Sequence, residues 1–84
     1  MPQILDEPIH DVIPAPGQQW PERFAWRGRV HHVRECGGAW RRRGRWWLGE
    51  GEKHFFRLLT HENLTLDLCR EEMTDQWTVA EVPD

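Results

Sequence analysis

Apolar and polar residues alternate from residue 23 onward. In "RFAWRGRVHHV" (residues 23–33), a strand would carry Phe24, Trp26, Gly28 and Val30 on one face and Arg27, Arg29 and His31 on the other. Gly37 and Gly38 interrupt this pattern and predict a hairpin turn. The next strand would be "AWRRRGRWWLG" (residues 39–49), with Gly44 as a candidate bulge. "GEGE" (residues 49–52) then predicts another turn.

The second half of the chain contains the clearest hairpin. "HFFRLLT" (residues 54–60) leads through His61-Glu62-Asn63 into "LTLDLCR" (residues 64–70), where leucines alternate with polar residues and a cysteine. A loop, "EEMTDQ" (residues 71–76), separates this hairpin from a last strand, "WTVAEV" (residues 77–82). Because no stretch sustains a 3.6-residue period, we predict a mainly β fold with five or six antiparallel strands, in a small barrel or curled sheet.

The N-terminal part of the chain follows a different pattern. Five of the six prolines occupy positions 2, 8, 14, 16 and 21, which excludes a regular helix or a central strand there. We therefore expect an extended Pro-rich arm over residues 1–21, followed by a single small β domain over residues 22–84. The arm also contains several isoleucines, so part of it is expected to lie along the body of the domain or against a partner.

The adjacent Trp46 and Trp47 provide a further test of the strand pattern. Neighbouring side chains in a strand point to opposite faces, so both indoles cannot enter the same core. Trp46 would share a face with Leu48, and Trp47 a face with Arg45. We expect Trp46 to be in the core and Trp47 to lie on the arginine-bearing surface.

Composition and charge make that surface distinctive. The chain has 84 residues, including six Trp and three Phe, and a formal net charge of −3. Residues 22–57 carry ten basic groups against four acids, a net +6, whereas residues 58–84 carry one arginine against seven acids, a net −6. The basic middle part would either bind a polyanion or pair with the acidic C-terminal third. The sequence leaves these two possibilities open.

Several classes of function are disfavoured. The chain has no serine and no phosphate-binding glycine loop, and the pairs Glu50/Glu52 and Glu71/Glu72 are interpreted as solvated turn charges, so we expect no enzyme activity and no cofactor. His32 and Cys36 would lie about 13 Å apart along a strand, too far to share a zinc ion, and we expect no metal site. The two cysteines are expected to be reduced thiols. With no signal peptide and no long apolar run, the chain is expected to be cytoplasmic, with no membrane contact.

Arginines interleaved with tryptophan favour single-stranded nucleic acid, which is held by cationic grooves and by aromatic rings that stack on bases. The expected binding residues are Arg27, Arg29, Arg41, Arg43, Arg45 and Trp47. The alternative is that the indoles build the core of a small domain and the arginines are solvated or internally paired.

The succession "FAWRGRVHHV", "WRRRGRWW", "GEGEKHFFRLLT" and "QWTVAEV" resembles a small bacterial family of uncharacterised domains. A related pattern occurs in the C-terminal region of the Y-family polymerase-like accessory proteins of bacterial mutagenic repair. The resemblance covers residues 22–82 and is carried by Trp26, Arg27, Gly28, Arg29, Trp46, Trp47, Phe56 and Arg57.

This resemblance implies a non-catalytic accessory module of DNA repair or damage tolerance that contacts single-stranded DNA. The alternative is an adaptor that docks on a repair or polymerase subunit through its arm or an open sheet edge. The segment "DLCREEMTDQW" (residues 67–77) is more acidic than the accessory-protein pattern, which favours a protein partner.

Overall fold

The computed structural model describes residues 2–83 of the chain. Within these residues it contains seven strands and one short 3₁₀ helix, and their bounds are β1 (Gln3–Pro8), β2 (His10–Pro14), β3 (Pro21–Trp26), β4 (Arg29–Arg42), η1 (Trp46–Leu48), β5 (Lys53–Thr60), β6 (Thr65–Glu71) and β7 (Gln76–Val82). The mainly β class is confirmed, but the expected count of five or six strands was too low.

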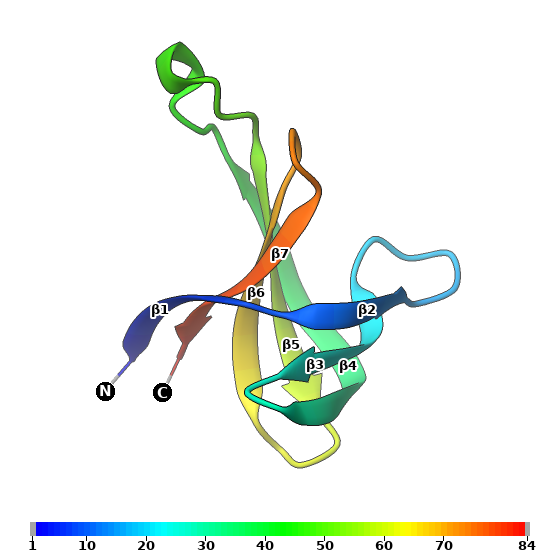
Figure 1. Cartoon of the computed structure of the whole chain (residues 1–84). Helices are drawn as coiled ribbons and strands as arrows, with labels where there is room; N and C mark the ends of the chain where they lie inside the picture. The colour runs from blue at the N-terminus through cyan, green and yellow to red at the C-terminus, as the bar shows by residue number, and fades with distance from the viewer. Residues whose placement is uncertain (1, 84) are drawn as a thin grey trace.

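All neighbouring strands are antiparallel, in the order β1-β7-β6-β5-β4-β3-β2. The sheet curls into a half-barrel, and β1 and β2 run as one nearly continuous strand across its open side (Figure 1). Only Ile9 separates β1 from β2, so a single segment of chain pairs with β7 by its first part and with β3 by its second. The predicted curled antiparallel sheet is confirmed.

The structure does not show the expected Pro-rich arm. Residues 3–14 form β1 and β2, and Ile9 between them is buried in the core. The prolines are compatible with strands because of where they lie. Pro8 and Pro14 end their strands and Pro21 begins β3, at positions where a missing N–H costs little. The prolines do exclude a central strand over these residues, but they allow edge strands, and β1 and β2 are the two end strands of the sheet.

Two turns differ from those predicted. β3 and β4 are joined by Arg27-Gly28, both with positive φ (53° and 72°), as a type I′ hairpin turn requires. The expected strand over residues 23–33 is therefore a hairpin. β4 instead continues through Gly37 and Gly38, where the register with β5 shifts, so the predicted turn there is a bulge within one long strand.

The hairpin of β5 and β6 is confirmed, and it supplies half of the buried core cluster. Leu58, Leu66 and Leu68 are fully buried, together with Phe24 of β3 and Val79 of β7. Burying each such side chain contributes about 1.5–3 kcal/mol of hydrophobic free energy. We call the side of the sheet that bears these residues the core face. The opposite side, called here the outer face, carries Lys53, Phe55 and Arg57 of β5.

Candidate nucleic-acid interface

The loop between β4 and β5, residues 43–52, projects beyond the body of the sheet (Figure 1). We call it the tip loop. At its neck the Gly44 N–H donates to the Gly51 carbonyl, with an N···O distance of 3.1 Å. Beyond the neck, η1 is closed by the Leu48 N–H, which donates to the Arg45 carbonyl at 2.9 Å. Gly49 ends the helix in the left-handed conformation, with a φ of 81°. The turn expected at residues 49–52 is thus the second half of this loop.

Two indoles stand in solvent on the tip loop. Trp46 and Trp47 are 70% and 65% exposed, and the next residue, Leu48, is 62% exposed. The two rings meet edge to face, with centroids 5.9 Å apart and an interplanar angle of 86°. The expectation that Trp46 lies in the core was wrong. In a 3₁₀ helix, successive side chains are about 120° apart, so the strand alternation does not apply and neither indole turns inward.

The arginines around the indoles differ in their pairing. Arg45 Nε donates to Glu50 Oε2 at 3.0 Å, and Arg41 lies 3.8 Å from a carboxylate oxygen of Glu52. Among the described residues, Arg43 makes no ion pair. Hydrogen bonding to the Arg45 backbone amide, with the charges of Arg45 and Lys53, holds the pKa of Glu50 below its usual value. All three arginines are exposed.

A stack of aromatic and guanidinium groups lies on the outer face below the tip loop. Trp40 and Phe55 are cross-strand partners whose rings are parallel within 5°, with centroids 5.6 Å apart. Arg42 covers Phe55 at 5.3 Å and Arg57 covers Trp40 at 5.5 Å. Each such cation–π contact contributes about 0.5–1 kcal/mol at an exposed site. Sequence reasoning missed this stack, although Trp40/Arg42 and Phe55/Arg57 are both separated by two positions, the spacing of one strand face.

Asp67 of β6 anchors one end of the stack. Its carboxylate is 1% exposed and accepts two hydrogen bonds from Arg57, at 2.8 and 3.0 Å. These hydrogen bonds raise the pKa of the Arg57 guanidinium. Beside the stack runs a groove of about 410 Å³, which Lys53 and Cys69 help to line. Burial raises the pKa of the Cys69 thiol.

The remaining predicted residues, Arg27 and Arg29, lie at the other end of β4. Arg41 follows Arg29 by twelve positions, about 40 Å of extended chain. Arg27 makes two hydrogen bonds to the Glu7 carboxylate, at 2.8 and 2.6 Å, and covers Trp26 at 4.5 Å. Of the six predicted residues, the structure therefore brings together Arg41, Arg43, Arg45 and Trp47 and leaves Arg27 and Arg29 apart.

The acidic C-terminal third neutralises little of this cationic surface. Within residues 2–83, the ion pair of Arg57 with Asp67 is the only one that joins an arginine of the basic middle part to an acid beyond residue 57. Asp75 pairs instead with Arg70 of its own segment, at 2.6 Å. The side chains of Arg43 and Arg45 on the tip loop therefore stay accessible to a ligand.

Three side chains that could hold a metal ion, those of Glu52, His54 and Glu72, converge at the base of the tip loop. Neither His32 nor Cys36, the pair considered from the sequence, belongs to this cluster. No helix within residues 2–83 has the length and apolar character needed to cross a membrane.

A family model described as a domain of unknown function (DUF6504) matches residues 1–84. The chain therefore belongs to this family. No curated protein and no solved structure matches it. The comparisons thus support the part of the resemblance that concerns an uncharacterised family, and they show no link to the polymerase-like accessory proteins.

Proposed function

We propose that this member of the family is a non-catalytic module that binds single-stranded DNA through the tip loop and the adjoining outer face. The observation that carries the proposal is the pair of exposed indoles, Trp46 and Trp47, which follow Arg43 and Arg45 at the end of a projecting hairpin. Exposed apolar groups of this size, gathered at one place, are typical of a binding surface.

The tip loop offers the two contacts that single-stranded nucleic acid uses. Each indole has a free face on which a base can stack, for about 1–3 kcal/mol per base. Arg43 has no acidic partner among the described residues, and Arg45 keeps an exposed side chain beside Glu50. Both guanidinium groups can therefore contact phosphates next to a stacked base.

The outer face provides a path for the adjoining nucleotides. Arg42 lies at the end of β4 next to the tip loop, and the stack continues from it through Phe55 and Trp40 to Arg57. A strand of DNA that leaves the indoles along this face meets two stacked aromatic rings with a guanidinium group at each end. The link to repair and damage tolerance rests on the resemblance of "WRGR" and "RWWLGEGE" to the accessory-protein pattern.

The test is the fluorescence anisotropy of a labelled single-stranded oligonucleotide titrated with protein at several salt concentrations. We expect reversal of Arg43 and Arg45 to Glu to weaken binding at least tenfold. The slope of log K against log salt should become shallower by about 1.4, since each lost phosphate contact removes about 0.7. The matched control reverses Arg29 and Arg34, two exposed arginines elsewhere on β4. Equal losses in both variants would mean that net charge, and not the tip loop, governs binding.

A protein-interaction adaptor is the second candidate. Docking through a free N-terminal arm has no structural basis, because residues 3–14 are paired strands. Within the described chain, however, β1 and β2 each pair with one neighbour, which leaves a backbone edge that a partner strand could extend. If the protein is such an adaptor, its affinity for a repair-complex subunit should depend little on salt and should not change when Arg43 and Arg45 are reversed to Glu.

A further inference from the structure

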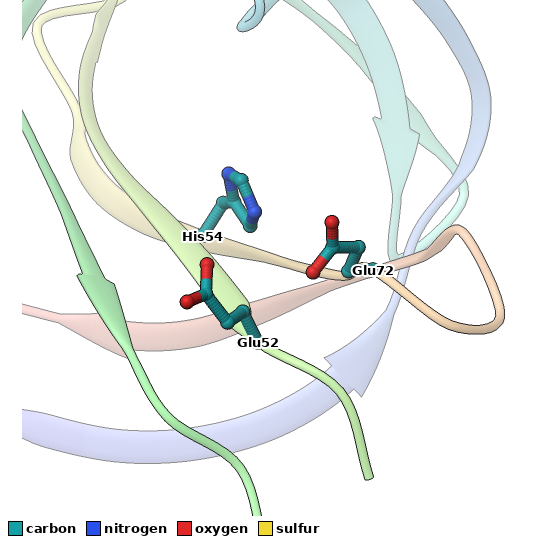
Figure 2. Close-up of side chains that lie close together, drawn as sticks. All are labelled: Glu52, His54 and Glu72. Atoms are coloured by element: carbon teal, nitrogen blue, oxygen red, sulfur yellow. The ribbon is translucent and has the colours of Figure 1, made fainter.

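The base of the tip loop and the turn between β6 and β7 lie side by side. Lys53 pairs with Glu71 in the ladder of β5 and β6, and the next residues outward, Glu52 and Glu72, are joined by a backbone hydrogen bond of 3.0 Å. His54 follows Glu52 by two positions and so points to the same face of the sheet. Figure 2 shows the imidazole and the two carboxylates pointing toward one another. One ligand atom of each residue lies within 4.8 Å of the other two.

His54 has an unusual environment for a polar side chain. It is only 8% exposed, and its Nε2 is buried without a hydrogen-bond partner among the described residues. Buried ring nitrogens are normally satisfied, because an unpaired one loses its hydration without compensation. Within residues 2–83, His54 Nε2 thus lacks the partner that a buried ring nitrogen normally has, and a ligand bound at this end of the core face would supply it.

A third carboxylate beside the cluster, that of Glu71, has structural partners. Glu71 accepts hydrogen bonds from the amides of Gly51 and Thr74, at 2.9 and 2.8 Å. Burial alone would raise the pKa of Glu71, but the hydrogen bonds from Thr74 and Gly51 outweigh it and lower the pKa. Glu71 thus fastens the tip loop to the β6–β7 turn. This arrangement holds the backbones that carry the two facing carboxylates in place.

Glu52 and Glu72 themselves are weakly compensated. The nearest cation to Glu52 is Arg41, at 3.8 Å, and no described cation pairs with Glu72. Two carboxylates that face each other across a strand pair repel, and a doubly charged cation between them would remove that repulsion.

We propose that Glu52, His54 and Glu72 bind one zinc ion. Imidazole nitrogen with carboxylate oxygen is a common zinc ligand set, whereas magnesium and calcium prefer oxygen alone. Zinc bonds of about 2.0–2.2 Å in tetrahedral geometry place ligand atoms about 3.4 Å apart. Side-chain rotations that move the ligand atoms by about 1 Å would therefore close the site around the ion. A water molecule would fill the remaining position. The ion would clip the base of the tip loop to the β6–β7 turn.

The sequence prediction of no metal site considered only histidines and cysteines close in the chain. Here the ligands come from two segments 20 residues apart in the chain, and two of the three are carboxylates interpreted as solvated turn charges. The proposal does not depend on DNA binding.

The test is isothermal titration of the purified full chain with zinc chloride, and separately with magnesium chloride. We expect one equivalent of zinc to bind and magnesium not to compete. Glu52→Gln and Glu72→Gln should each weaken zinc binding at least tenfold, since both side chains are exposed and their loss leaves the fold intact. Glu35→Gln, an exposed carboxylate on β4, is the matched control and should bind as the wild type does.

A second readout locates the ion, because four other histidines and two cysteines could bind zinc adventitiously. In nitrogen NMR spectra of the wild-type protein, the imidazole signals of His54 should shift at one equivalent before those of any other histidine. Unchanged affinity in both glutamate variants would overturn the proposal. So would a zinc titration that leaves the His54 signals in place.

Discussion

The neck of the tip loop gives the sharpest structural prediction, the effect of Gly44→Ala. A Cβ added to Gly44 would overlap the carbonyl oxygen of Gly51 and would lie 2.9 Å from Glu50 Cβ. To restore ordinary contact distances the two backbones must separate by roughly 1 Å. The Gly44 N–H···O=C Gly51 hydrogen bond, 3.1 Å long, would then exceed the usual range. Its loss costs about 0.5–1.5 kcal/mol and would disturb the tip loop and its contact with Glu71, but not the buried core cluster, to which none of residues 43–52 belongs.

The consequence for DNA binding is larger than for stability. When the neck opens, Trp46 and Trp47 lose their fixed edge-to-face arrangement and must be ordered again on binding, at about 0.5–1.5 kcal/mol per side chain. Oligonucleotide affinity should fall roughly 5- to 150-fold. The exciton signal of the indole pair in circular dichroism should diminish as well. The control is Gly38→Ala, where an added Cβ meets nothing within 4 Å. If Gly44→Ala binds DNA as tightly as Gly38→Ala, the neck does not hold the indoles in place for binding.

Three further predictions concern the body of the sheet. Leu68→Ala removes a fully buried side chain from a central strand and should lower the free energy of unfolding by about 2–5 kcal/mol in urea titrations. Hydrogen bonding to Arg27 holds the pKa of Glu7 below its usual 4.5, so this pair stabilises the fold above that pH and its contribution is lost as the pH falls through the lower folded pKa. When the melting temperature is measured at decreasing pH, it should fall less in Glu7→Gln than in the wild type. Cys69, which is buried with a raised pKa, should react with iodoacetamide far more slowly than the half-buried Cys36, as mass spectrometry of the native protein can measure.

The sequence predicted the fold best where alternation coincided with burial. In the β5–β6 hairpin, Leu66 and Leu68 alternate with polar residues, and the structure buries both leucines. The pattern failed where special backbone conformations intervened. Arg27-Gly28 makes a tight turn although Asn-Gly or Asp-Gly is the usual signal, and the Arg27–Glu7 pair helps to hold the arginine there.

Long-range pairing accounts for the remaining differences. Nothing local in residues 3–14 indicates that β7 and β3 would pair with them, because that pairing depends on how the whole sheet curls. Likewise, the strand expected over residues 39–49 ends at Arg42, and beyond it the neck hydrogen bond between Gly44 and Gly51 closes a loop with a helical turn. The arginine and tryptophan composition indicated an interface, but only the fold could separate Arg27 and Arg29 from the residues at the tip.

The most direct test of the central claim is tryptophan fluorescence during titration with a short single-stranded oligonucleotide, at low and at moderate salt. The wild-type protein is compared with a Trp46→Ala/Trp47→Ala variant, whose melting temperature should be unchanged because both indoles are exposed. We expect quenching in the wild type that weakens with salt and is largely absent in the variant. Quenching of equal size in both proteins, or none in the wild type at either salt, would contradict it.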